Sequence, residues 1–363
     1  MKIGVMLRNL REKGGIVVYA TNLLQALLRL DRQNDYIFLY RYDSDRGRFG
    51  KQQNLEEVVL PSFSKLWWDQ YEVPRFAAKE NIDLIYNPKL SIPLLSDSKM
   101  VFVMHGGAQV VVPHLFKWYD RIYFTLANKL YCRRADAIIT MTHLGAKDLI
   151  RYMGADERKI HVIHEAYNPY CKVLSPNEAV RSKYSLPEKF ILFVGGITPL
   201  KNFGNILRAF QIIPRSLPHK LVVVGFNRWK FKDDLRLVDK LGVGDRIMFP
   251  GFVPDEEIPD FYNLAELFVF PTIYEGFGIP ILEAMACGCP VITSITGCAP
   301  EVAGDAAELV DPYSPEDIAL AIERLLTDEA LRQSRIKKGL SRATNFSWDK
   351  CARETLKVFQ SFS

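Results

Sequence analysis

A chain of 363 residues is long enough for two domains of ordinary size. Hydrophobic residues make up 48% and charged residues 25%, which is typical of a packed soluble protein and excludes a disordered, collagen-like or disulfide-stapled chain. The 47 Lys and Arg against 42 Asp and Glu give a net charge of +5, an excess too small to predict nucleic-acid binding but suited to an anionic ligand or membrane surface.

Targeting and cysteine signals are weak. No apolar run approaches the ~20 residues of a membrane-spanning helix, and the amino-terminal segment lacks a signal-peptide core, so we expect a cytoplasmic protein. The six cysteines show no paired CxxC spacing, as expected in a reducing compartment. Cys287, Cys289 and Cys298 lie close in sequence, but no histidine or second cysteine pair completes a zinc pattern. We interpret them as buried free thiols and expect no metal.

The first half of the chain alternates short apolar runs with amphipathic stretches of helical length. Strands are predicted at 2–7, 36–40, 84–86, 100–104, 137–140 and 159–163, and helices at 16–30, 67–80, 116–134 and 144–153. Strands separated by helices pair in parallel and form an open sheet that is covered on both faces.

The second half repeats this scheme. Strands are predicted at 190–194, 220–224, 247–249, 267–270 and 290–293, and a helix at 205–213. We therefore expect an α/β protein with two doubly wound, Rossmann-like domains, at 1–170 and 189–346, joined by a linker at 171–188 and followed by a helix at 347–363 that could cross back to the first domain. Ligands bind at the carboxyl ends of strands in such sheets, so two sheets facing each other would enclose an interdomain cleft.

The most informative stretch is residues 271–292, PTIYEGFGIPILEAMACGCPVI. It leaves a strand, passes two glycines and enters a short helix that Gly288 is suited to end. The backbone amides of Phe277, Gly278 and Ile279 would then point outward from the helix N-terminus, where they can bind phosphate or sugar oxygens.

Two carboxylates frame this turn. Glu275 lies in the loop and Glu283 eight residues later on the helix, and both can accept hydrogen bonds from ligand hydroxyls. The alternative is a structural one, in which Glu283 interacts only with the helix dipole and Glu275 is an exposed loop charge. Two carboxylates around a Gly-rich strand-to-helix turn favour the ligand site.

The segment resembles the signature of the retaining GT-B glycosyltransferases of family GT4. Glu275 and Glu283 match the family's EX7E motif, and the resemblance continues in VGGITPLKN (194–202), in the Gly14-Gly15 turn and in DAIITMTHLGAKDLIRYMG (136–154). It implies a GT-B fold and retaining transfer of a hexose from a nucleoside-diphosphate sugar, GDP-mannose or a UDP-hexose, to a glycan, lipid-linked or small-molecule acceptor. No metal cofactor is implied.

The resemblance also implies roles for particular residues. Glu283 would hold the ribose hydroxyls, and Glu275 would contact the transferred sugar together with the three amides of the turn. Lys201 would neutralise the diphosphate leaving group, a role that a cation opposite a diphosphate can fill on physical grounds alone.

Three further positions fall in the implied donor site. Gly15 would let the amino-terminal loop approach the phosphates without a side-chain clash. Gly196 belongs to the glycine turn that precedes Lys201. Val253 would lie beside the base.

One departure from the family pattern concerns a second cation. Many members carry an Arg close to the lysine of the VGGITPLKN segment, at positions occupied here by Gly196 and Leu200. Either another cation supplies this charge or turnover is weaker than is usual in the family. Arg8, Arg11 and Lys13, which flank the amino-terminal glycine turn, are the candidates.

His105 follows the predicted strand 100–104 and precedes two glycines. A histidine on a turn at the carboxyl end of a strand is suited to contact a ligand, and GT4 enzymes often have one there. We interpret it as a contact for the sugar or the acceptor; the alternative is a structural histidine with satisfied hydrogen bonds.

The segment 115–134 interleaves aromatic and basic residues in a predicted helix. They are Phe116, Trp118, Tyr119, Tyr123, Phe124 and Tyr131, with Lys117, Arg121, Lys129, Arg133 and Arg134. Such a helix can lie on an anionic membrane, with Trp67 and Trp68 adding to the patch and a lipid-linked acceptor within reach. The alternative, which we favour, is a helix packed on its own sheet whose Lys and Arg stems cover apolar surface.

Two other functions remain open. A nucleotide-sugar epimerase or phosphorylase of the same fold would keep the nucleotide site, and a non-catalytic partner subunit would bind the nucleotide sugar weakly or not at all. The intact pair Glu275 and Glu283 argues against the second. No strand-end carboxylate in the first half is an obvious covalent nucleophile, so front-face transfer is the mechanism we expect.

Overall fold

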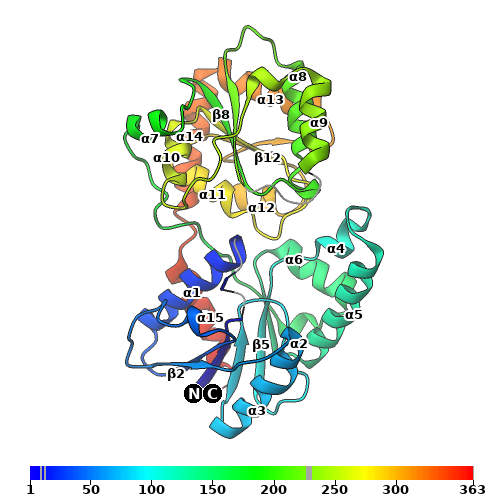
Figure 1. Cartoon of the computed structure of the whole chain (residues 1–363), viewed down its shortest axis with the longest axis vertical. Coiled ribbons are helices and arrows are strands. Elements are labelled where there is room, and N and C mark those ends of the chain that lie inside the picture. Colours follow the sequence, from blue (N-terminus) through cyan, green and yellow to red (C-terminus); the bar gives the residue numbers. More distant parts are fainter. Residues whose placement is uncertain (9, 12–13, 226–230, 363) are drawn as a thin grey trace. The chain divides into compact units, whose positions relative to one another are not determined.

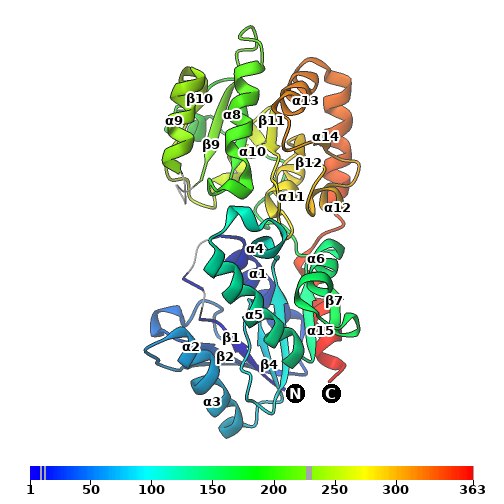
Figure 2. The same ribbon diagram turned by 90° about the vertical axis from the view of Figure 1, so that its right-hand side faces the viewer.

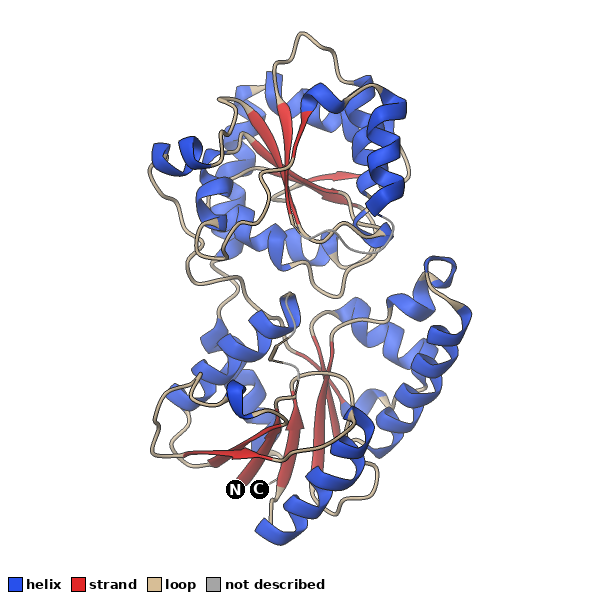
Figure 3. Cartoon of the chain, viewed as in Figure 1, coloured by secondary structure: helices blue, strands red, loops and turns tan. Residues whose placement is uncertain are grey.

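The computed structural model describes residues 1–8, 10–11, 14–225 and 231–362, and for 231–235 the backbone alone. The chain divides into two compact units. The first contains residues 1–166 and the carboxyl-terminal segment from 347, and the second contains residues 167–346 (Figure 1). In each unit a sheet is flanked by helices (Figure 3).

The described part of the first unit is built on a seven-stranded parallel sheet. Its strands are β1 (Lys2–Met6), β2 (Asp35–Tyr40), β3 (Leu55–Val59), β4 (Leu84–Asn87), β5 (Lys99–Met104), β6 (Ala137–Thr140) and β7 (Ile160–Val162). They lie in the order β3-β2-β1-β4-β5-β6-β7. The central strands β4 and β5 are apolar except for Asn87 at the end of β4 and the exposed Lys99 at the start of β5, because both faces of the sheet are buried.

Different helices cover the two faces of this sheet. The helices are α1 (Gly15–Leu30), α2 (Lys65–Trp67), α3 (Val73–Glu80), α4 (Ala108–Val111), α5 (Trp118–Arg134), α6 (His143–Asp148) and α15 (Trp348–Gln360), with π-helical turns at Trp68–Glu72 and Leu149–Met153. On one face α1 packs against α15, and the rings of Tyr86 and Phe359 lie 5.1 Å apart. The other face forms one hydrophobic core with α3, α5 and the second π-helical turn.

The described part of the second unit has a six-stranded parallel sheet. Its strands are β8 (Phe190–Val194), β9 (Lys220–Val224), β10 (Ile247–Met248), β11 (Leu267–Phe270), β12 (Val291–Ser294) and β13 (Glu308–Val310), in the order β10-β9-β8-β11-β12-β13. Its helices are α7 (Glu178–Lys183), α8 (Phe203–Ile212), α9 (Phe231–Leu241), α10 (Ile258–Leu264), α11 (Ile279–Ala286), α12 (Ala299–Ala303), α13 (Pro315–Thr327) and α14 (Glu329–Ala343). Helix α8 packs against α9 and α13, and α11 against α14 (Figure 2).

Each sheet reverses its strand order once. In the first unit the chain winds outward from β1 to β3 and then resumes on the opposite side of β1 with β4, and in the second unit the same reversal separates β8 from β11. Loops that follow the two strands at a reversal leave toward opposite faces, which opens a crevice at the carboxyl end of the sheet. A ligand site is therefore expected at the loops after β8 and β11.

The doubly wound α/β prediction is confirmed, and each of the predicted strands is present. Two strands escaped prediction, β3 and β13, because both lie at a sheet edge and are short or only half-buried. The stretch 171–188, for which a linker is expected, carries α7 and belongs to the compact second unit.

The six cysteines are all free and buried, so the interpretation of Cys287, Cys289 and Cys298 as buried thiols is confirmed. Among the described residues no cluster of His, Cys, Asp and Glu has a metal-binding arrangement. None of the helices described is both long and apolar enough to cross a membrane.

Gly225, directly after β9, lets the backbones of two loops touch. A Cβ at this position would lie 2.0 Å from the carbonyl oxygen of Gly195, so the Gly225→Ala substitution must displace the loop after β8. We expect the free energy of unfolding to fall by about 2 kcal/mol or more, as in overpacked cores. Gly244→Ala is the control, because its Cβ would meet Val238 at an ordinary 3.6 Å. Equal midpoints of urea unfolding for the two variants would contradict the prediction.

Candidate active site

The loop after β8 presents Lys201 at the reversal of the second sheet. A short 3-10 turn (Pro199–Lys201) leads to Asn202, which adopts a left-handed conformation (φ 59°) at the start of α8. The buried Asn202 amide donates to the carbonyl oxygens of Pro271 (3.0 Å) and Pro312 (2.5 Å). These bonds tie the loop to the segments that follow β11, the neighbour of β8, and β13, the edge strand of the sheet, and hold the lysine beside the end of β11.

The loop after β11 brings Glu275 to this lysine. The Ile273 amide donates to the Leu200 carbonyl oxygen (2.8 Å), so the two loops are joined through their backbones. The Nζ atom of Lys201 then lies 2.6 Å from Oε1 of Glu275, with less than a fifth of either side chain exposed. This is a short, charge-assisted contact between the two residues that the sequence singled out.

An aromatic ring supports the lysine from a second direction. The Nζ atom of Lys201 lies 4.4 Å from the ring centroid of Phe270, the last residue of β11, within the range of a cation–π interaction. The ammonium group is thus held in place before any ligand arrives. A bound diphosphate would meet a positioned cation instead of a mobile surface lysine.

Glu283 lies on α11, the helix that follows the Glu275 loop. Its carboxylate accepts hydrogen bonds from the Tyr262 hydroxyl (3.2 Å) and from the backbone N–H of Asn168. Burial raises the pKa of Glu283 to about 7, an effect that these two bonds oppose and the nearby charge of Asp255 strengthens. Near neutral pH this carboxyl is therefore divided between its protonated and its ionised form.

The turn between the two carboxylates is shaped by Gly278, which adopts φ 90° directly before α11. The Phe277 side chain is buried against Phe346, with ring centroids 5.8 Å apart, and its carbonyl oxygen accepts from the Cys298 thiol (3.0 Å). The amides of Gly278 and Ile279 consequently lie at the amino-terminal end of the helix, where the backbone dipole favours an anion.

The remaining donor-site candidates of the second unit are Gly196 and Val253. Gly196 lies in the same loop as Lys201, whereas Val253 is buried in the segment after β10. Their expected contacts with the donor stay predictions.

In the first unit, His105 follows β5 and is held by the loop after β4. Its Nε2 atom lies 2.7 Å from the Pro88 carbonyl oxygen, and its ring packs edge-on against Tyr19 (4.8 Å). Burial lowers the pKa of His105 to about 4, so the ring is neutral at pH 7. Because a carbonyl oxygen can only accept, Nε2 carries the proton and Nδ1 is left as an acceptor, suited to a ligand hydroxyl.

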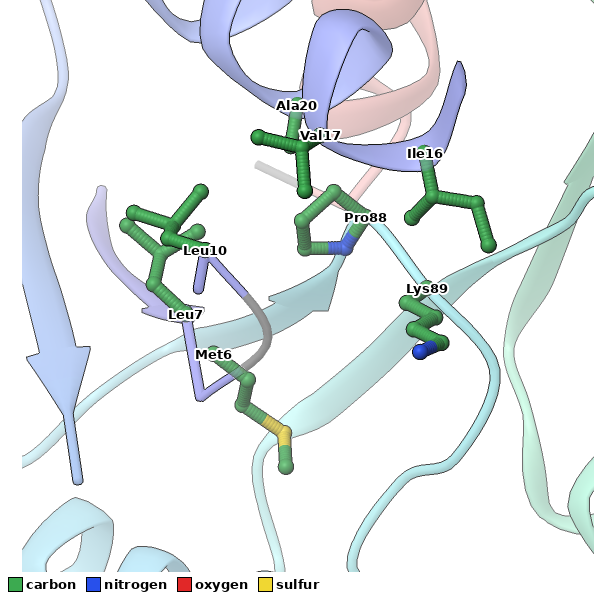
Figure 4. A pocket seen from close by; sticks show the side chains of 8 residues that line it. All are labelled: Met6, Leu7, Leu10, Ile16, Val17, Ala20, Pro88 and Lys89. Carbon is green, nitrogen blue, oxygen red and sulfur yellow. The ribbon is translucent and has the colours of Figure 1, made fainter. Parts of the chain in front are cut away.

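Gly15 is the first residue of α1, and it is Gly14 that adopts the positive φ (122°) at this turn. A small pocket lies beside the turn, between the segments that follow β1 and β4 (Figure 4). It is lined by Met6, Leu7, Leu10, Ile16, Val17, Ala20, Pro88 and Lys89. The lining is apolar except for Lys89.

The expected substitutes for the family's second cation have partners within the first unit. The Arg8 guanidinium forms a bidentate pair with Asp69 (2.7 and 3.0 Å) and also bonds Ser91. Arg11 pairs with Asp45 at 3.4 Å. Lys13 lies outside the described residues.

Sequence reasoning missed the residues that position the site. Asn202, Tyr262 and Phe270 each contact or orient a predicted site residue, yet they carry no chemistry that stands out in sequence. For Asn202 there was a signal, since asparagine is among the few residues that tolerate the left-handed conformation directly before a helix. Tyr262 and Phe270 are indistinguishable from core residues until the fold places them.

Comparison with known proteins agrees with this arrangement. A model of the Glycosyltransferase Family 4 domain matches residues 13–169, and a model of the Glycosyl transferases group 1 domain matches residues 176–342. The chain belongs to the GT4-type glycosyltransferases.

Relatives include several mannosyltransferases. The O-antigen chain mannosyltransferase B of Escherichia coli is 34% identical over 62% of this chain and 61% of that protein. The serotype-specific mannosyltransferase WbdA of E. coli is 32% identical over 62% of this chain and 29% of its own length. The matched region thus spans less than two thirds of either relative.

Solved structures show the same GT-B fold. Anabaena Alr3699/HepE in complex with UDP-glucose superposes with a TM-score of 0.80 at 18% identity, covering 99% of this chain and all of that one. The sucrose-phosphate synthase of Thermosynechococcus elongatus gives 0.79 at 21% identity, over 99% and 98% of the two chains.

The raised pKa of Glu283 predicts how the stability of the fold changes with pH. The folded protein binds the carboxyl proton of Glu283 more tightly than the unfolded chain does, because the carboxyl of the unfolded chain has the ordinary pKa near 4.5. The favourable contribution of this proton to the free energy of unfolding is therefore lost as pH rises from about 4.5 through about 7. The Glu283→Gln variant should be more stable than the wild type at pH 8, with a difference that shrinks toward pH 4.5.

Thermal unfolding across this pH range measures the effect. In the Tyr262→Phe variant the pH range over which this stability is lost should move upward, because the variant lacks the hydroxyl hydrogen bond that lowers the pKa of Glu283. A difference between Glu283→Gln and wild type that stays constant with pH would refute the assignment.

Proposed function

We propose that this protein transfers a hexose from a nucleoside-diphosphate sugar to a hydroxyl acceptor, with retention of configuration at the anomeric carbon. The observation that carries the proposal is the Lys201–Glu275 pair at the strand-order reversal of the second sheet, with Glu283 on the helix that follows. One cation for a diphosphate and two carboxylates for sugar and ribose hydroxyls are the groups that such a donor requires.

The donor would be held by the second unit. Glu283 accepts from the ribose hydroxyls, for which its ionised form offers two acceptor oxygens, and the tyrosine behind it fixes its orientation. The diphosphate meets Lys201 and the amides at the start of α11. Glu275 then exchanges part of its contact with the lysine for hydroxyls of the transferred sugar.

The reaction needs no protein nucleophile. The acceptor oxygen attacks the anomeric carbon from the face on which the phosphate leaves, the carbon–oxygen bond to the diphosphate breaks, and the acceptor proton passes to the departing phosphate oxygen. Negative charge grows on the diphosphate during this step, so a positioned Lys201 lowers the barrier. His105, neutral and with Nδ1 as an acceptor, would orient a hydroxyl of the sugar or the acceptor.

Mannose is the first sugar to test, because the relatives named above are mannosyltransferases. GDP-mannose is thus the leading donor and UDP-hexoses the second. The acceptor is proposed to be a glycan or a lipid-linked sugar, as befits a relative of O-antigen chain synthesis.

The test is a product assay with GDP-mannose, UDP-glucose and UDP-galactose against a panel of oligosaccharide and lipid-linked acceptors. Lys201→Ala and Glu275→Ala should each lower kcat about 100-fold or more, as expected for loss of a transition-state charge or of substrate positioning. The Lys338→Ala variant is the control, since it breaks a surface ion pair of the same unit (2.7 Å to Asp305). Activity should survive a chelator, because Lys201 supplies the charge opposite the diphosphate.

Each other outcome has a definite meaning. Full activity of Glu275→Ala would contradict the assignment. Conversion of the donor without any acceptor would identify an epimerase or a phosphorylase instead, and absence of donor binding would indicate a non-catalytic subunit. Retention itself is read from the anomeric configuration of the product by NMR.

A further inference from the structure

Helix α5 carries six large apolar side chains on the face that turns to solvent. Trp118, Tyr119, Ile122, Tyr123, Leu126 and Leu130 are each 48–69% exposed. At 100° per residue these six side chains fall within an arc of about 140° on the helix surface. An ordinary surface helix presents polar residues on this arc. The expected packing of this helix on its own sheet is present, but the Lys and Arg stems leave these six apolar side chains exposed.

The opposite side of α5 already has its partners. Tyr131 and Cys132 are buried in the core beneath the sheet, and Phe124 and Ala127 pack against that core. Packing within the unit therefore uses one side of the helix and accounts for none of the exposed apolar side chains on the other.

Charge on the exposed arc has one sign. Lys129 and Arg133 lie among the apolar side chains at the same helical spacing, and Lys117 and Arg121 flank its amino-terminal end. The single acidic residue of the helix, Asp120, projects from a different side. An apolar face bordered by basic residues complements an anionic, amphipathic surface.

A second exposed apolar group lies on the same side of the unit. Phe63, Leu66, Trp67 and Tyr71 are 41–79% exposed, with the ring of Trp67 between those of Phe63 (5.4 Å) and Tyr71 (4.5 Å). Leu66 and Trp67 lie on α2, and Tyr71 lies on the π-helical turn that follows. This turn and α3 pack into the same core as α5, on one face of the sheet (Figures 1 and 2). Trp68, expected to join this group, is instead buried and donates to the Leu60 carbonyl oxygen (2.9 Å).

We propose that α5, together with residues 63–71, docks on the surface of an anionic lipid bilayer. Trp and Tyr rings insert at the headgroup level, Ile and Leu reach the acyl boundary, and Lys and Arg contact lipid phosphates. A bilayer satisfies both requirements of this surface at once, whereas a protein partner would have to provide a complementary groove that is also acidic. The proposal goes beyond glycosyl transfer and does not depend on the identity of the donor.

Vesicle co-sedimentation of the full chain tests the docking. Binding should be strong for vesicles of phosphatidylcholine with about one third phosphatidylglycerol, weak for pure phosphatidylcholine, and reduced at high salt. The triple variant Trp118→Ser, Ile122→Ser and Leu126→Ser should lose binding. In the double variant Lys129→Gln and Arg133→Gln the partition coefficient should fall about fivefold for each charge removed.

Controls separate docking from folding and from self-association. All five substituted side chains are exposed, so the variants should unfold at the wild-type temperature. The Leu320→Ser variant, which changes an equally exposed leucine (55%) on α13, should bind vesicles like the wild type.

Three results would overturn the proposal. The first is that the wild-type protein does not bind phosphatidylglycerol vesicles. The second is that the triple variant still binds them. The third is a wild-type oligomer, seen by size-exclusion chromatography, that the triple variant dissociates while neither form binds vesicles. That last result would make the surface an interface between copies of this chain.

Discussion

The contact between Lys201 and Glu275 is the interaction on which the account of this protein depends. Opposite charges meet at 2.6 Å because two loops leave adjacent parallel strands where the strand order reverses. Backbone and amide hydrogen bonds join those loops, so the position of the charges follows from the sheet and not from flexible side chains. A diphosphate that enters this site competes for a lysine that is already oriented.

The same region contains two features that cost stability, a buried carboxyl group and a residue in a left-handed backbone conformation. Burial raises the pKa of the Glu283 carboxyl on α11 to about 7, and Asn202 adopts the left-handed conformation, which is uncommon for residues other than glycine although asparagine tolerates it better than most. Such local costs persist when the surrounding structure enforces them, and they concentrate at functional sites. They agree with a site built to receive hydroxyls and phosphates.

Much of this arrangement could be predicted from the sequence, because it depends on local signals. The strand-to-helix segment with its two carboxylates is contiguous, and two of its glycines, Gly278 before the helix and Gly288 after it, adopt the positive φ that glycine favours. What could not be predicted depends on tertiary contacts. The ring of Phe270 beneath the lysine is one example, and the hydroxyl of Tyr262 on Glu283 is another.

The solvent-facing side of helix α5 also could not be predicted, because it too depends on tertiary contacts. Its sequence predicted a helix of mixed aromatic and basic character, but which arc would face the core depends on how it packs on the sheet. The edge strands β3 and β13 escaped prediction because few neighbours bury them, which weakens the apolar pattern that identifies a strand.

The central claim is that Lys201 is held for the diphosphate of a donor. Calorimetric titration of wild type and Lys201→Met with GDP, UDP and the corresponding nucleosides tests it most directly. We expect the variant to bind the preferred diphosphate about tenfold or more weakly, the usual effect of losing a charge-assisted bond, and to bind the nucleoside as the wild type does. Equal affinity of both proteins for the diphosphate would contradict it.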